Sequence, residues 1–159
     1  AMSQTKLVAL LDANVLYPAT LRDLLIWLAV CEAFHAHWTP EITQEWMQNL
    51  LKDRQDLSAE RLERTLSLME NALPYANLIG YENHVTALKL PDSNDRHVLA
   101  AAIHVGADVI VTQNLRDFPS TILEPLGIRA VHPDDFICSI KDNALTGASQ
   151  FWGLSKIEA

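Results

Sequence analysis

Cysteine is scarce in this chain of 159 residues, and long apolar runs are missing. The two cysteines, Cys31 and Cys138, do not suggest a disulfide framework, so a reduced, cytoplasmic setting is expected. No segment approaches the roughly 20 apolar residues of a membrane span, because the longest candidate, 21–34, contains three charged residues. No signal peptide is evident, since the first apolar run is short and ends in an acid. We therefore expect a cytoplasmic protein with no membrane partner.

Basic residues are also few: 12 Lys and Arg stand against 20 Asp and Glu, which gives a formal net charge of -8. This balance argues against a general nucleic-acid binder, whose surface is usually basic. It does not exclude a nuclease, because acids that bind metal ions add negative charge that the cations offset.

Several catalytic motifs are missing. The sequence has no G-x-S-x-G elbow, no Walker-type glycine loop and no H-E-x-x-H pair. Zinc spacing between cysteine and histidine is absent as well. His97 is expected on a helix surface. The remaining candidates for chemistry are the carboxylates.

The apolar pattern predicts alternating strands and helices within one domain. Buried-type strands are expected at 6–11, 109–112 and 128–131, with a doubtful one at 78–81. Such alternation predicts an α/β fold with a parallel sheet. We place the domain at 3–141 and a C-terminal extension, docked or partner-contacting, at 142–159.

The stretch 90–118 concentrates the polar signals. Asp92 and Asp95 offer N-cap chemistry for a short apolar helix, which Gly106 should end. A Val-Ile-Val strand follows and ends in the polar turn that begins at Thr112. The carboxyl ends of parallel strands are where open α/β sheets bind ligands.

Further acids are expected at the same edge of the sheet. Asp12 directly follows the first strand, and Glu45 lies on a helix that Thr39 should cap. Each acid also has a simpler structural explanation, because Asp12 can cap a helix and Glu45 can lie on a solvated helix face. Carboxylates gathered without matching bases favour Mg²⁺ or Mn²⁺, which can activate water for attack on a phosphate. The expected metal ligands are Asp12, Glu45, Asp92, Asp95 and Asp117, with Asn14, Thr112 and Asn114 as auxiliary polar groups.

Three arginines are candidate phosphate contacts: Arg22, Arg96 and Arg116. A surface ion pair is an equally good explanation for each of them. The helix predicted over 21–34 carries two apolar stripes, so it is either deeply buried or in contact with a partner, such as a second copy of the chain.

Taken in order, these motifs resemble the PIN-domain ribonucleases, and in particular the VapC-type toxins of bacterial toxin–antitoxin pairs. The resemblance rests on the strand before Asp12, on Glu45, on P-D-S-N-D-R-H-V-L-A-A-A at 91–102 and on V-T-Q-N-L-R-D-F at 111–118. It covers residues 6–140 and implies a three-layer α/β/α sandwich with a central parallel sheet. It also implies an acidic Mg²⁺ or Mn²⁺ pocket, cleavage of RNA within the strand, and inhibition by an antitoxin.

By position, the resemblance makes Asp12, Glu45 and Asp95 the catalytic acids and Asp92 an accessory one. Asn114 stands where the family often has a fourth acid, and Asp117 is a candidate to compensate. An Asn ligand has an oxygen without a charge, so a second metal should bind more weakly. Two alternatives stay open: a catalytically weak PIN-like binding module, and a structure-specific DNA nuclease with the same chemistry.

Overall fold

The computed structural model of the chain describes residues 6–88 and 90–141. The C-terminal extension predicted for 142–159 lies outside the described residues, as do the first three residues of the predicted domain. The described part contains a parallel four-stranded sheet with the order β2-β1-β3-β4. The strands are β1 (Val8–Leu11), β2 (His35–His37), β3 (Val109–Val111) and β4 (Arg129–Val131).

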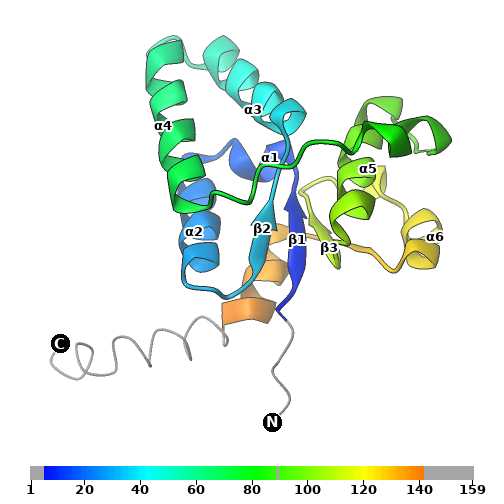
Figure 1. Cartoon of the computed structure of the whole chain (residues 1–159). Coiled ribbons are helices and arrows are strands. Elements are labelled where there is room, and N and C mark those ends of the chain that lie inside the picture. The colour runs from blue at the N-terminus through cyan, green and yellow to red at the C-terminus, as the bar shows by residue number, and fades with distance from the viewer. Residues whose placement is uncertain (1–5, 89, 142–159) are drawn as a thin grey trace, which may run out of the picture.

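Helices connect these strands (Figure 1). They are α1 (Ala13–Leu16), α2 (Ala19–Val30), α3 (Pro40–Asp53), α4 (Ala59–Ala72), α5 (Arg96–Val105) and α6 (Ser120–Leu123). Short 3₁₀ helices are η1 (Glu82–Ala87), η2 (Ser93–Asp95), η3 (Leu115–Asp117) and η4 (Glu124–Leu126). A last helix begins at residue 133 and reaches the end of the described segment at 141.

The order of the strands separates the helices into two layers. From β1 the chain passes through α2 to β2 on one side, and then through α5 to β3 on the other side of β1. Right-handed crossovers in opposite directions place α2 and α5 on opposite faces of the sheet, where Figure 1 shows them. The fold is therefore the α/β/α sandwich that the resemblance to PIN-domain proteins implied.

The two central strands are buried because helices cover both faces. All three residues of β3 are buried, as are the last three of β1. Continuous apolar strands of this kind are typical of parallel sheets. The change of direction between β1 and β3 is a topological switch point, where the carboxyl ends of the strands leave a crevice for ligands.

Helix ends follow the local sequence signals. The Thr39 hydroxyl accepts a hydrogen bond from the Ile42 N–H at 3.0 Å, and Pro40 occupies the first turn of α3. Gly106 ends α5 in the left-handed region, at φ 70°. Both capping predictions are confirmed.

Two local expectations differ from the structure. The strand β2 was not predicted, because His-Ala-His lacks an apolar run and gains its place by pairing with β1. Residues 78–81 do not form a strand; an isolated bridge, between Trp38 and Asn77, lies just before them. Within residues 6–88 and 90–141, no helix combines the length and apolar character needed to cross a membrane.

Candidate active site

Asp12 lies at the switch point, directly after β1. It is 6 % exposed, and it caps α1 by accepting a hydrogen bond from the Ala13 N–H at 2.8 Å. Its own N–H donates to the Val111 carbonyl at 3.0 Å, which continues the pairing of β1 with β3. The capping explanation for Asp12 is therefore correct, and the same geometry presents its carboxylate at the carboxyl edge of the sheet.

Polar side chains from two strand ends hold this carboxylate in place. The Thr112 hydroxyl, fully buried after β3, donates to Asp12 Oδ2 at 2.9 Å. Asn14 Nδ2 donates to the same oxygen at 3.2 Å and to Thr112 Oγ1 at 3.0 Å. Asn14 and Thr112 thus fix the orientation of the Asp12 carboxylate.

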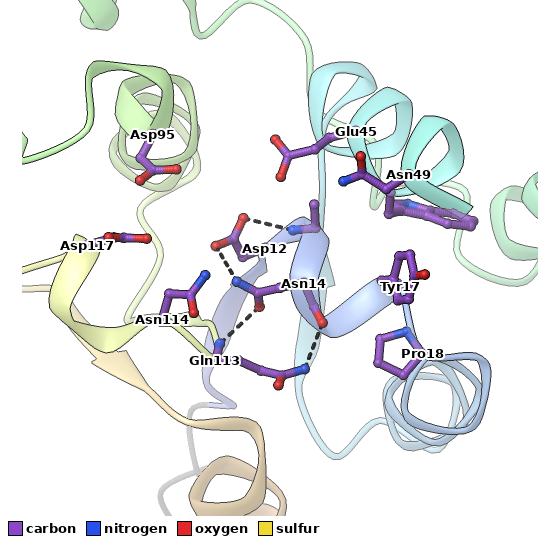
Figure 2. A pocket seen from close by; sticks show the side chains of 12 residues that line it. Asp12, Asn14, Tyr17, Pro18, Glu45, Asn49, Asp95, Gln113, Asn114 and Asp117 are labelled. Atoms are coloured by element: carbon purple, nitrogen blue, oxygen red, sulfur yellow. Dashed lines mark hydrogen bonds between the residues drawn. The ribbon is translucent and has the colours of Figure 1, made fainter. Parts of the chain in front are cut away.

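The loop after β3 is tied to α1 by the same network (Figure 2). The Gln113 N–H donates to Asn14 Oδ1 at 2.9 Å, and Gln113 Nε2 donates to the Asn14 carbonyl at 2.8 Å. The Asn114 N–H donates to Thr112 Oγ1 at 3.1 Å. These bonds fix where Asn114 and Asp117 stand relative to Asp12.

Three more carboxylates surround Asp12 from three other elements. Glu45 comes from α3, Asp95 from the end of η2 and Asp117 from η3. Figure 2 shows Asp12, Glu45, Asp95 and Asp117 around one space, with Asn114 beneath Asp117. The four acids line a single pocket of about 460 Å³.

Asp92 has a different position. Its side chain is exposed and accepts a hydrogen bond from the Asn94 N–H at 2.9 Å, which caps η2. It does not line the pocket, but its charge raises the pKa of both Glu45 and Asp95. Asp92 therefore belongs to the rim of the acidic cluster.

The electrostatic cost of this cluster falls most heavily on Asp95. Burial, followed by the charges of Asp12, Asp117, Asp92 and Glu45, raises the pKa of Asp95 to about 7. Burial also raises the pKa of Asp12, although the Thr112 and Ala13 hydrogen bonds oppose that change. The pKa of Glu45 is raised first by burial and next by Asp12.

The donor set fits a hard divalent cation. Asp95 Oδ2 is buried without a hydrogen-bond partner among the described residues, and no Lys or Arg is among the residues that line the pocket. Oxygen donors that repel one another are the ligands that Mg²⁺ and Mn²⁺ prefer. The side chains line the pocket without converging: no three His, Cys, Asp or Glu groups in the described segments are close enough to enclose an ion.

The three candidate arginines lie in different surroundings. Arg22 is 6 % exposed; its Nη1 donates to the Leu16 carbonyl at 2.8 Å, and its guanidinium lies 4.8 Å from the centre of the Trp46 ring. Arg96 Nε donates to the Ser93 carbonyl at 3.2 Å. Arg116 is exposed on η3 beside Asp117. None of the three forms an ion pair within the described residues.

The pocket contains residues that the sequence analysis missed. Asn49 lines it one turn after Glu45, and this i, i+4 spacing could have identified it. Tyr17 and Trp46 also line it, without an evident sequence signal.

The prediction of a surface position for His97 is wrong: the residue is half-buried, its Nδ1 has no partner in the described part of the chain, and its charge acts on Asp12 and Glu45.

Comparisons with known proteins agree with this architecture. The sequence model of the family described as "PIN domain" matches residues 8–116. "Putative ribonuclease VapC50" of Mycobacterium tuberculosis is 48% identical over 67 residues, which are 42% of this chain and 39% of that protein. The matched segment thus spans about two fifths of the relative's length. No solved structure matches the chain. Because the family model covers more than half of the chain, including Asp12, Glu45 and Asp95, this protein belongs to the PIN-domain family.

Proposed function

We propose that the protein is a Mg²⁺- or Mn²⁺-dependent endoribonuclease and the toxin of a toxin–antitoxin pair. The observation that carries the proposal is the set of four carboxylates that four elements bring to one pocket without a lining base. The similarity to a protein named as a ribonuclease supports RNA as the substrate. Phosphodiester hydrolysis uses such carboxylate pockets to hold cations against the phosphate.

In this proposal Asp12, Glu45 and Asp95 would hold the cation, partly through bound waters, with Asp92, Asp117 and Asn114 as auxiliary groups. A bound Mg²⁺ or Mn²⁺ supplies water activation and neutralises charge on the phosphate. Asp12 is already oriented by Thr112 and Asn14, so little side-chain entropy remains to be lost there. The Asp95 carboxyl, with a pKa of about 7, must give up its proton before it can act as a ligand.

The partners we propose are an RNA substrate, a cognate antitoxin protein and a second copy of the chain, all in the cytoplasm. The outer face of α2 supports a protein partner, because Leu24, Trp27 and Val30 are 39 to 49% exposed there. Leu25, Leu28 and Ala29 bury the opposite stripe of the same helix. An exposed apolar stripe of this kind is typical of interaction surfaces.

The first test removes the charge of single acids. Asp12→Asn and Asp95→Asn should each lower the rate of Mg²⁺-dependent RNA cleavage by at least about 100-fold, because each removes a charged metal ligand. Asp23→Asn is the matched control, since Asp23 is exposed on α2 and does not line the pocket. Cleavage is measured on purified protein by gel, and folding by circular dichroism.

The outcomes separate the proposal from its alternatives. Full activity in folded Asp12→Asn and Asp95→Asn proteins would exclude the acidic pocket as the active site. Cleavage of single-stranded DNA at the same rate as RNA of the same sequence would favour a DNA nuclease. Sequencing the ends of cleaved RNA after induction, against the Asp12→Asn protein, identifies the target.

Asn114 favours one alternative. Its side chain lines the pocket at the place where the family often has a fourth acid. If Asp117 does not compensate for this amide, a second cation would bind weakly, and such a protein could act mainly as a binding module. Asn114→Asp should then increase cleavage and lower the Mg²⁺ concentration that cleavage needs. A wild-type protein that neither cleaves RNA nor responds to metal would favour the binding module.

A further inference from the structure

A second pocket lies beside the acidic one and is lined by arginines. It has a volume of about 360 Å³ and lies between the start of α2, the end of α3 and α4. Arg22, Arg54 and Arg61 line it, and no acid does. The chain has only 12 basic residues, so three in one pocket mark a local reversal of its overall charge of -8.

The two pockets adjoin at one point. Tyr17 and Pro18 line both of them. In Figure 2 these two residues stand on the side of the acidic pocket opposite Asp95 and Asp117. An RNA chain bound at the carboxylates and running over Tyr17 would therefore enter the space between the arginines.

The charges in this second pocket are held in different ways. Arg22 is more than nine-tenths buried, is fixed by the Leu16 and Tyr17 carbonyls, and keeps a buried Nε without a partner in the described residues. Arg54 pairs with Asp56, with its Nε and Nη2 at 2.9 and 2.8 Å from the two carboxylate oxygens. Arg61 is exposed and forms no ion pair in the described chain, although its charge acts on Asp56. Arg61 is the cation left to meet a ligand.

The walls suit a nucleotide rather than a bare ion. Leu50 and Leu62 are buried against the pocket, and half-buried Leu57 and Thr65 complete it. Tyr17 contributes an aromatic ring whose hydroxyl donates to Asp53 at 2.7 Å. Single-stranded RNA is held in proteins by cations on its phosphates and by aromatic or guanidinium planes on its bases.

We propose that this arginine pocket holds a nucleotide of single-stranded RNA that flanks the scissile phosphate, with Arg61 on its phosphate and Tyr17 beside its base. The inference rests on the proposed ribonuclease function. It gives the substrate a cationic contact that the acidic pocket lacks, because phosphate contacts position a nucleic acid and supply most of its salt-dependent affinity.

The test compares Arg61→Ala with Arg64→Ala, which removes the same charge from the same helix. Arg64 is exposed and does not line the pocket. Both changes are made in the full chain carrying Asp12→Asn, and binding of a fluorescein-labelled single-stranded RNA of about 12 nucleotides is followed by anisotropy. Arg61→Ala should weaken binding roughly three- to tenfold and reduce the slope of log Kd against log salt by about 0.7. Arg64→Ala should change neither quantity.

Cleavage provides an independent readout in the otherwise wild-type chain. Arg61→Ala should raise KM for the 12-nucleotide RNA with little change in kcat, because Arg61 contacts a phosphate other than the one that is cleaved. Equal RNA binding by the Arg61→Ala and Arg64→Ala proteins would overturn the proposal while leaving the ribonuclease assignment intact.

Two further outcomes are decisive. Lower RNA affinity in the Arg61→Ala protein, in a chain that cleaves no RNA, would support the pocket and reject the ribonuclease function. Unchanged RNA binding together with lost binding of a polyglutamate peptide would overturn the proposal and reassign the pocket to an acidic protein partner.

Discussion

Thr112 is the residue on which the local geometry depends most. Its hydroxyl donates to Asp12 and accepts from Asn14 and from the Asn114 N–H, so one buried group joins β1, α1 and the loop after β3. Thr112→Val keeps the shape and removes the hydroxyl. We expect it to lower the free energy of unfolding by about 1–3 kcal/mol, because it leaves buried polar groups with fewer partners.

Urea unfolding at pH 7 measures this loss, and Thr112→Ser is the control because it keeps the hydroxyl. The Ser variant should retain most of the stability and of the RNA cleavage. If Thr112→Val were as stable as Thr112→Ser, the hydroxyl network would not be what holds Asp12.

Asp95 should make the metal-free protein less stable as the pH rises. Its pKa is about 7 in the folded chain, against an ordinary value of 3.8 for an Asp carboxyl. Between these values the folded state binds more protons than the unfolded state, so the free energy of unfolding falls as pH increases from about 4 to 7. Burial and the surrounding acids also raise the pKa of Asp12 and of Glu45. Both shifts add to the decrease in the free energy of unfolding.

In the presence of EDTA, the free energy of unfolding of the Asp95→Asn protein should therefore decrease less steeply with pH than that of the wild type. At pH 8 we expect the free energy of unfolding of the Asp95→Asn protein to exceed that of the wild type by about 1–2 kcal/mol. This figure is smaller than the full pKa shift would give, because Asp95 is only partly buried. This corresponds to about 2–8 °C in Tm. Thermal melts at pH 5 and pH 8 measure it, with Asp23→Asn as the control. Parallel pH profiles for wild type and Asp95→Asn would contradict the raised pKa.

At the scale of elements, the sequence predicts what local chemistry encodes. The strand before Asp12, the Thr39 cap and the Gly106 stop all follow from side-chain chemistry within a few residues, and all three are present. The parallel α/β sheet follows from the alternation of strands and helices, whereas the three-layer α/β/α arrangement was implied by the resemblance to the PIN-domain family. The strand at His35–His37 could not be predicted in this way, because its pairing with β1 comes from tertiary structure.

The candidate site divides along the same line. The order of the acids along the chain was enough to nominate Asp12, Glu45, Asp95 and Asp117, which the fold brings to one pocket. The position of Tyr17 in the pocket lining and the half-buried position of His97 depend on how α1, α3 and α5 pack. Such packing leaves no signature within a single segment of sequence.

The end of α5 allows a test of one element. Gly106 has a φ of 70°, and a Cβ built there meets no atom within 4 Å. Gly106→Ala should therefore cost about 1 kcal/mol from backbone conformation alone. Gly106→Asn should cost less, because Asn tolerates the left-handed region better. Urea unfolding separates the two variants, and an Ala variant as stable as wild type would contradict this account of the helix end.

At the scale of the whole molecule, charge is distributed unevenly. Four carboxylates line the acidic pocket without a lining base, in a chain whose net charge is -8, while three arginines line the adjoining pocket. A fold that brings like charges together carries a cost that a bound cation can remove. The stability of the whole chain should therefore depend on divalent metal.

Mg²⁺ or Mn²⁺ should raise the Tm of the wild-type protein by mass action. At a metal concentration of 100 times Kd, the gain is about 2.7 kcal/mol, or about 5–11 °C for a chain of this size. The shift should be larger at pH 8 than at pH 5.5, because Asp95 competes for protons with a pKa of about 7. The Asp12→Asn protein should lose most of this metal-induced rise in Tm, and the Asp23→Asn protein should keep all of it. A wild-type Tm that is the same in EDTA and in Mg²⁺, in a protein that still cleaves RNA, would show that the carboxylates act without a resident cation, and the pocket chemistry would then have to be assigned to proton transfer by these acids.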